Sequence, residues 1–268
     1  YLTPIPPLDE QRRILAKLSE VLPVVKNYGV VYDETTAMQE AFPESLKKSI
    51  LQEAVQGKLV PQDPSDEPAE ALLERIRVEK QRLIKEGKVK KDKRESVIFR
   101  RDNSHYEKRG SEVVCIDDEI PFDIPELWSW CRLNELCTKI GAGSTPTGGK
   151  TIYVPEGIKF IRSQNVYNDG LKLNDISYIT EEINAKKKGS IVRSKDILLN
   201  ITGGSIGRCA VVPDDFDIAN VNQHVMIIRL VEPKMRHWIH TILISEYIQN
   251  LIMDVQVGVS REGLSATK

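Results

Sequence analysis

The sequence predicts an α+β protein in which a long, coiled-coil-forming helical segment precedes a β-rich globular domain. Two observations support this fold class. Between residues 14 and 54, apolar side chains recur at alternating steps of three and four, which is the spacing of a coiled-coil seam. From residue 120 onward, short runs of strand-forming residues alternate with glycine, proline and asparagine, as is typical of a compact β-rich domain.

The helical segment, residues 1–62, begins after a proline-rich approach at positions 4–7. Proline fixes backbone φ and favours an extended lead-in, and Asp9 and Glu10 suit the positive end of a helix dipole. Pro23 and Pro43 each lack a backbone donor. We therefore expect a kink or a break near these two prolines.

The seam is too long to be covered by the chain's own globular domain. An unbroken helix over residues 9–56 would reach roughly 70 Å at about 1.5 Å per residue, well past the diameter of a small domain. We therefore expect the seam to dock a partner, and we expect the isolated chain to form a homodimer through it. The predicted docking residues are Ile14, Leu18, Val21, Val25, Met38, Phe42, Leu46 and Ile50.

Residues 63–118 are predicted to hold a second, highly charged helix followed by a basic linker. The helix, from Glu67 to Gly87, has a narrow apolar stripe that we expect to pack against the first helix. The linker begins with the run KVKKDK at residues 88–93. Such a run is usually a solvated tether, although contact with phosphate groups is an alternative.

Composition limits the function classes. The 38 basic and 39 acidic residues give a net charge of −1, so nucleic-acid binding would have to depend on local patches. No apolar run approaches the roughly 20 residues that span a bilayer, and we expect a soluble, cytoplasmic protein. The 4 cysteines form no CxxC pair, which predicts reduced thiols and no metal site. The first residue is Tyr1 and the chain stops at LSATK, so we expect a fragment.

The third region, residues 119–268, is the predicted globular domain, with helices only at 181–188 and 235–255. Its segment GSTPTGGKT, residues 143–151, has the composition of a phosphate-binding loop. The spacing is wrong, because five residues rather than four separate Gly143 from Gly149 and no helix signal follows. A nucleotide-dependent enzyme is therefore disfavoured. The chain also lacks the common catalytic motifs, so we expect no catalysis from it alone.

Five stretches, taken together, resemble the specificity subunit of type I restriction-modification systems. They are PIPPLDEQRRILAKL, LKKSILQEAVQGKLVPQ, IPELWSWCRLNEL, DILLNITGGSIGRCAVV and ANVNQHVMIIRL. In that family two target-recognition domains alternate with two long helical segments, which pack antiparallel as a spacer and bind the methyltransferase subunits. The resemblance implies that residues 1–62 are the central helical segment and residues 119–268 the second target-recognition domain. The first recognition domain would precede this chain, and the distal helical segment would follow it.

The resemblance also implies a function and a set of partners. It implies a non-catalytic host-defence subunit that reads one half of a bipartite target in double-stranded DNA. The implied partners are the methyltransferase (modification) subunits and, through the complex, the restriction/translocase subunit, with no membrane. No cofactor is implied for this chain, because S-adenosylmethionine, ATP and magnesium belong to the partners. An adaptor protein whose β-rich domain binds protein is the alternative, although protein interfaces tend to be richer in aromatic residues.

Base readout in the major groove needs side chains that donate and accept in pairs, such as Arg for guanine and Asn or Gln for adenine. These types cluster in three loops, and Lys150 lies in a fourth. The predicted DNA-binding residues are Lys150, Arg162, Ser163, Gln164, Asn165, Thr202, Gly203, Gly204, Ser205, Arg208, Asn220 and Gln223. We expect the glycines to set loop shape, and Asn222 and His224 to brace the loops. The clusters could equally be ordinary turns or internal hydrogen-bond networks.

Overall fold

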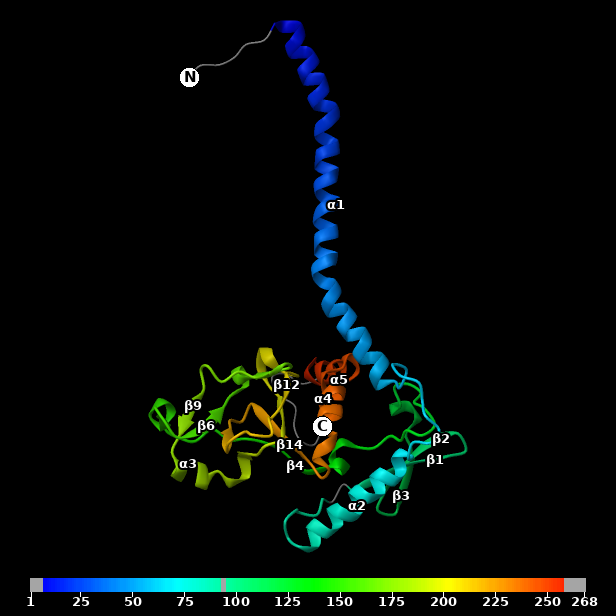
Figure 1. Cartoon of the computed structure of the whole chain (residues 1–268), viewed down its shortest axis with the longest axis vertical. Helices are drawn as coiled ribbons and strands as arrows, with labels where there is room; N and C mark the ends of the chain where they lie inside the picture. The colour runs from blue at the N-terminus through cyan, green and yellow to red at the C-terminus, as the bar shows by residue number, and fades with distance from the viewer. Residues whose placement is uncertain (1–6, 93–94, 258–268) are drawn as a thin grey trace. The chain divides into compact units, whose positions relative to one another are not determined.

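The structure, a computed structural model, describes residues 7–92 and 95–257. Its backbone contacts divide the chain into two units, Tyr1–Ile50 and Leu51–Lys268. Helix α1 (Leu8–Val55) supplies the first unit, and its last residues belong to the second (Figure 1). The second unit mixes helices and sheets, as the predicted α+β class requires. The division into residues 1–62, 63–118 and 119–268 remains a prediction.

Helix α1 is continuous over 48 residues and contains both Pro23 and Pro43. Of the kink or break that the sequence predicted near these prolines, a break does not occur. The flanking side chains of Leu22 and Val24 are 59% and 67% exposed, so the backbone carbonyl that a proline leaves without a donor is open to water. Among the described residues, no helix is both long enough and apolar enough to cross a membrane.

Helix α2 (Ala69–Lys85) lies within the predicted second helix. Its buried side chains Leu73 and Ile76 join a core cluster with Leu136 and Cys137. The stripe that we expected to pack against the first helix therefore packs into the core of the globular unit.

A β-meander follows α2, where the sequence predicted a linker. Strands β1 (Ser96–Arg101), β2 (Ser104–Arg109) and β3 (Glu112–Cys115) form an antiparallel sheet in the order β1-β2-β3. Asp102 and Asn103 connect the first two strands with φ values of 53° and 63°. Positive φ at both central residues is the geometry of a tight hairpin turn, which Asp and Asn tolerate.

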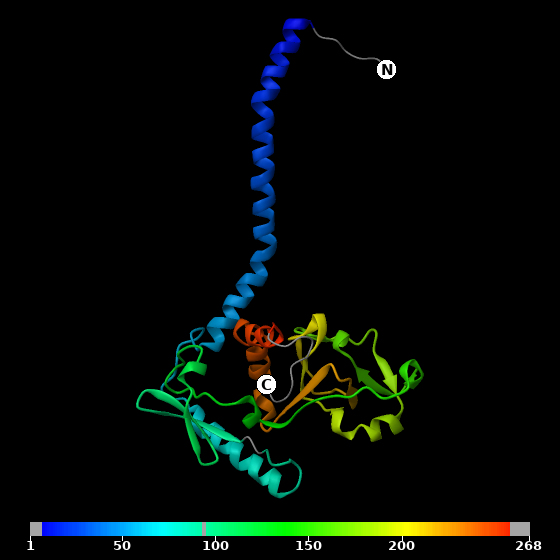
Figure 2. The same cartoon turned by 180° about the vertical axis from the view of Figure 1, so that it is seen from behind.

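Two further sheets, green to orange in Figure 2, form the layers of the remaining domain. The five-stranded sheet has the order β10-β13-β6-β9-β5, with bounds Ile191–Val192, Ala219–Val221, Ile158–Ile161, Ser177–Ile179 and Tyr153–Val154. The four-stranded sheet has the order β12-β11-β14-β4, with bounds Cys209–Val211, Ile197–Asn200, Val225–Leu230 and Cys137–Ala142. A small hairpin pairs β7 (Val166–Tyr167) with β8 (Gly170–Leu171).

The four-stranded sheet is covered on both faces. Leu198 and Ile227 share a core cluster with residues of the five-stranded sheet. Their neighbours Ile197 and Ile228 belong to a second cluster, shared with α2, α4 (Arg236–Ile244) and α5 (Glu246–Val257). Alternate residues of a strand face opposite sides, so a strand buried on both faces is continuously apolar, as ILL in β11 is.

Short helical turns link the strands. The remaining helix is α3 (Glu181–Lys186), and it starts at Thr180, whose side chain accepts a hydrogen bond from the backbone of Ile183. The 3-10 turns are η1 (Asp117–Glu119), η2 (Leu133–Leu136), η3 (Gly149–Ile152), η4 (Ser163–Asn165), η5 (Lys188–Ser190), η6 (Gly203–Ser205) and η7 (Pro233–Met235). The helices predicted at 181–188 and 235–255 are confirmed as α3 and as the pair α4 and α5.

Candidate nucleic-acid interface

Strand directions bring the predicted loops to one edge of the two sheets. Strands β6 and β13 are parallel, so both end at this edge, and the backbone of Asn222 donates to Ile161 across it. Strand β11 is antiparallel to β12 and β14, so its end at Asn200 meets the starts of both neighbours. We call residues 143–145, 162–172, 200–208 and 222–224 the loop edge.

Buried Asn200 connects two of the predicted clusters. Its Nδ2 donates to the backbone oxygen of Ser163 at 2.8 Å and to Oγ of Ser205 at 3.1 Å. Its backbone amide donates to Arg208 and its backbone oxygen accepts from Gly207. Asn200 was missed by the sequence analysis, although its place at the end of an apolar strand, before a glycine-rich turn, was a signal.

A second hydrogen-bonded chain connects the remaining loops. Oγ1 of Thr202 lies 2.5 Å from Nδ1 of His224, whose Nε2 lies 3.1 Å from Nε2 of Gln223. Oε1 of Gln223 accepts from the hydroxyl of Thr145. The side chain of Asn222 is buried and accepts from the backbone of His224 at 3.1 Å. His224 and Asn222 thus brace the loops, as their sequence context predicted.

Two residues of the predicted DNA-binding set are buried instead of presented at the surface. Asn165 is 1% exposed, accepts from the backbone of Arg162 and donates to the backbone of Lys172. Asn220 is 0% exposed and donates to Asn184 and to the backbone of Lys187. Asn165 is the last residue of the turn η4 and Asn220 is the middle residue of β13, and both amides are used inside the domain because nearby polar groups need partners. They support the loops and offer no surface to a duplex.

The other members lie at the surface to different degrees. Gln164, Gly203, Gly204 and Gln223 are exposed, and Arg162, Ser163, Thr202, Ser205 and Arg208 are partly exposed. A guanidinium nitrogen of Arg162 donates to the backbone of Asp175 at 3.3 Å. The side chain of Lys150 lies outside the described residues. The remaining described members of the predicted set therefore form a polar surface on loops that are fixed by the buried hydrogen bonds.

Two glycines allow close approach at this edge. A Cβ on Gly143 would collide with the backbone oxygens of Val221 and Asn222, so only glycine fits where the 143–151 loop leaves β4. Gly207 has a φ of 84°, and a Cβ there would collide with the side chain of Gln249 from α5. After Gly149 the chain enters η3 and then β5, so no long helix begins there to hold phosphates.

Three of the four cysteines are unsuited to nucleophilic catalysis. Burial raises the pKa of the Cys137 and Cys209 thiols far above the usual range and that of Cys131 to about 12. These thiols are therefore protonated and are poor nucleophiles. No group of three His, Cys, Asp or Glu side chains among the described residues could hold a metal ion.

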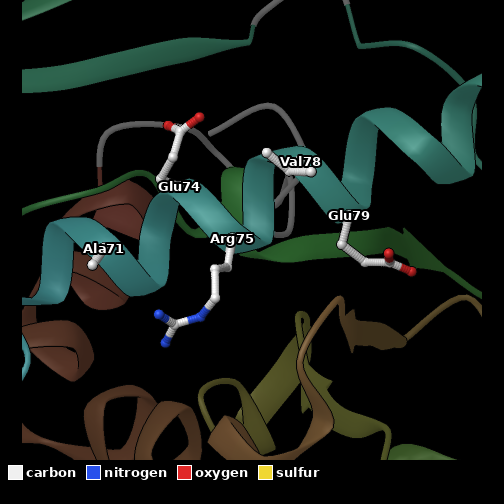
Figure 3. A pocket seen from close by; sticks show the side chains of 5 residues that line it. All are labelled: Ala71, Glu74, Arg75, Val78 and Glu79. Atoms are coloured by element: carbon white, nitrogen blue, oxygen red, sulfur yellow. The ribbon is translucent and has the colours of Figure 1, made fainter.

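One surface hollow, beside α2, lacks the enclosure of a small-molecule site. It is lined by Ala71, Glu74, Arg75, Val78 and Glu79, which all belong to α2 (Figure 3). Val78 is 62% exposed, and Arg75 is held by Glu67 from the preceding turn. Within the part of the chain that the structure describes, groups from a second element do not line this hollow, whereas ligand sites are enclosed by converging groups.

Comparison with known proteins decides the family. A family model described as the type I restriction modification DNA specificity domain matches residues 125–268. The chain belongs to this family. The matched region of this specificity domain contains the entire loop edge.

Three curated relatives are specificity subunits of type I restriction enzymes. The type I restriction enzyme EcoAI specificity subunit of Escherichia coli is 28% identical over 235 residues, which cover 74% of this chain and 36% of that protein. The EcoEI specificity subunit of Escherichia coli is 43% identical over 115 residues, covering 43% of this chain and 16% of that protein. The EcoBI specificity subunit of Escherichia coli is 25% identical over 274 residues, which cover 98% of this chain and 45% of that protein. The specificity-domain chain spans less than half the length of each relative.

Two solved structures are similar at low levels. One, described as the structural basis underlying complex assembly and conformational transition of the type I R-M system, gives a TM-score of 0.44 at 14% identity, covering 97% of this chain and 45% of that chain. The HsdS subunit from Thermoanaerobacter tengcongensis gives a TM-score of 0.38 at 18% identity, covering 90% of this chain and 42% of that chain. Both TM-scores are too low to carry a structural argument.

Proposed function

We propose that this chain recognises DNA sequence for a type I restriction-modification complex and that the loop edge is the surface that contacts the duplex. The observation that supports the proposal most strongly is that several loops come together at one edge of the domain. Loops with base-reading side chain types, far apart in the sequence, meet at one edge of the domain that the family model matches. Buried amides fix these loops, and recognition residues on a rigid scaffold are a common arrangement.

We further propose that α1 docks partner helices. Its described docking residues are Leu18 at 45%, Val21 at 39%, Val25 at 59%, Met38 at 71%, Phe42 at 62%, Leu46 at 45% and Ile50 at 45% exposed, and the side chain of Ile14 lies outside the described residues. Leu15, Leu22 and Val24, outside this seam, are also exposed. A helix with this much uncovered apolar surface gains its stability from a partner. The proposed partners are the methyltransferase subunits and, for the isolated chain, a second copy.

In this proposal the chain reads one half of a bipartite target in double-stranded DNA and performs no chemistry. S-adenosylmethionine, ATP and magnesium belong to the partner subunits, and the restriction/translocase subunit joins through the complex. In this role the protein would act in the cytoplasm, where it has access to DNA.

The test is a duplex titration of the full chain at several salt concentrations. Alanine at Lys150 or Arg162 weakens binding and lowers the slope of log affinity against log salt by about one each, because one phosphate contact is lost. Lys234→Ala is the matched control, since this exposed lysine follows the far end of β14. Unchanged affinity and slope in both loop variants would reject these assignments. Absence of duplex binding by the unmodified chain would reject the function.

A further inference from the structure

Two cations converge on one tyrosine ring at the loop edge. Nζ of Lys172 lies 4.0 Å from the centroid of the Tyr167 ring, and Cζ of Arg208 lies 4.7 Å from it. The three residues come from separate places, since Tyr167 lies in β7, Lys172 follows β8 and Arg208 precedes β12. The face of an aromatic ring is electron-rich and attracts cations at these distances.

The backbone on both sides of this ring is fixed. In the β7–β8 hairpin Tyr167 pairs with Gly170, whose φ of 134° suits glycine alone. The side chain of Asn168, at the hairpin tip, accepts from the backbone amide of Cys209 at 2.9 Å. This hydrogen bond holds the hairpin against the residue that follows Arg208. The ring and the guanidinium are therefore positioned before any ligand binds.

Lys172 is fixed in the same way. Its backbone amide donates to the backbone oxygen of Asn165 at 2.9 Å, and its own oxygen accepts from Asn165 Nδ2 at 2.9 Å. Buried Asn165, which was predicted to contact DNA, thus orders a lysine that does reach the surface. The lysine side chain itself is 55% exposed.

The charges around the ring are only partly balanced by the described residues. Within the described residues no carboxylate lies at ion-pair distance from Arg208. Lys172 lies 3.8 Å from Asp169, and the two side chains are 55% and 74% exposed, so this pair is weak. Two positive groups held against one ring raise the local positive potential, which favours a nearby anion.

We propose that Tyr167, Lys172 and Arg208 form a phosphate clamp that binds the DNA backbone beside the base-reading loops. The proposal deepens the function proposed above and rests on it. Lys172 and Arg208 supply the charges, and Tyr167 is a positioning residue that aligns them. Phosphate contacts of this kind set the register of a protein on the duplex, and base contacts such as those of Gln164 then select the sequence.

The experiment is a fluorescence anisotropy titration of the full chain with a labelled duplex of mixed sequence, at several salt concentrations. Alanine at Lys172 or Arg208 weakens binding roughly five- to ten-fold near 0.1 M salt and lowers the salt slope by about one each, and the double variant lowers it by about two. Arg208→Lys keeps the charge and keeps the slope. Lys234→Ala changes neither quantity.

Tyr167 variants separate the ring from the charges. Tyr167→Leu weakens binding about three-fold with little change in slope, because the charges remain but their alignment is lost. Tyr167→Phe keeps the ring and binds like the unmodified chain. Equal losses in the Phe and Leu variants would overturn the positioning role.

The outcomes distinguish the clamp from the proposed function. Salt-dependent binding by the unmodified chain with no effect of either alanine would overturn the clamp and leave the function in place. No duplex binding by the unmodified chain, even at low salt, would overturn both. Thermal unfolding of each variant, measured by circular dichroism, shows whether a loss of binding reflects a loss of folding.

Discussion

Helix α1 and the globular unit use the same apolar residue types in opposite environments. In α1, Leu18 and Leu46 are each 45% exposed, whereas Leu198 and Ile227 in the four-stranded sheet are each 0% exposed. The sheet residues complete a core with other parts of their own chain. The helix residues are exposed in this chain, and this difference in burial is the reason for proposing that a partner covers them.

Truncation of a core side chain has the largest expected effect. Leu198→Ala removes buried atoms at a site packed on all sides and lowers the free energy of unfolding by about 3–4 kcal/mol. Urea unfolding of the full chain measures this change. Leu46→Ala is the matched control and lowers the stability of the globular unit by less than about 0.5 kcal/mol. Equal losses at the two positions would break the comparison.

Buried and exposed ion pairs differ in the same way as the apolar side chains, and breaking a buried pair has the second-largest expected effect on stability. Buried Glu107 accepts from Arg132 at 2.7 Å and 3.1 Å and from Arg109 at 2.6 Å. The hydrogen bonds from Arg132, followed by that from Arg109, lower the pKa of Glu107 to about 2. Glu107→Gln therefore lowers the free energy of unfolding by about 3 kcal/mol at neutral pH. In α1, Glu20→Gln breaks only an exposed pair with Lys17 and changes stability by about 0.5 kcal/mol or less.

The direction in which stability changes with pH follows from the pKa shifts of two buried carboxyl groups. Because its pKa is lowered by folding, Glu107 stabilises the protein above its ordinary pKa, and this contribution is lost as pH falls from about 4.5 to about 2. Glu135 behaves in the opposite sense, since burial raises its pKa and penalises the ionised form at neutral pH. Glu135→Gln should leave stability at neutral pH unchanged or raise it. A loss equal to that of Glu107→Gln would contradict this account of the two carboxyl groups.

The smallest expected effect on folding is at the seam of α1. Met38→Glu, at a side chain that is 71% exposed, leaves thermal unfolding of the globular unit unchanged but prevents the proposed homodimer. Light scattering at increasing protein concentration measures the change in mass. Gln39→Glu adds the same charge at the next residue, outside the predicted seam, and should leave the dimer intact. A monomeric unmodified chain at high concentration would contradict the homodimer.

The sequence predicted features that depend on local pattern. The spacing of apolar residues predicted α1, and the polar residues after strands KFI and DILLN predicted recognition loops, which the structure brings together at one edge. The signal for the β-meander was also local, because Asp102 and Asn103 separate two strand-like runs, and it was overlooked.

Other features depend on contacts between distant residues, which one sequence does not contain. Nothing near Asn165 or Asn220 distinguishes a base-reading amide from one used inside the domain, because the difference lies in which loop folds over it. Tyr167 was missed for the same reason, since Arg208 is 41 positions away in the sequence. The packing of α2 into the core, rather than against α1, likewise depends on tertiary structure.

The most direct test of the central claim is selection of duplexes from a randomised library by the full chain, followed by sequencing. The account predicts one short, contiguous motif, and it predicts that Gln164→Ala relaxes the preference at part of that motif while the phosphate-clamp variants weaken binding to all sequences alike. Recovered sequences that match the input library would contradict the claim that this domain reads DNA sequence.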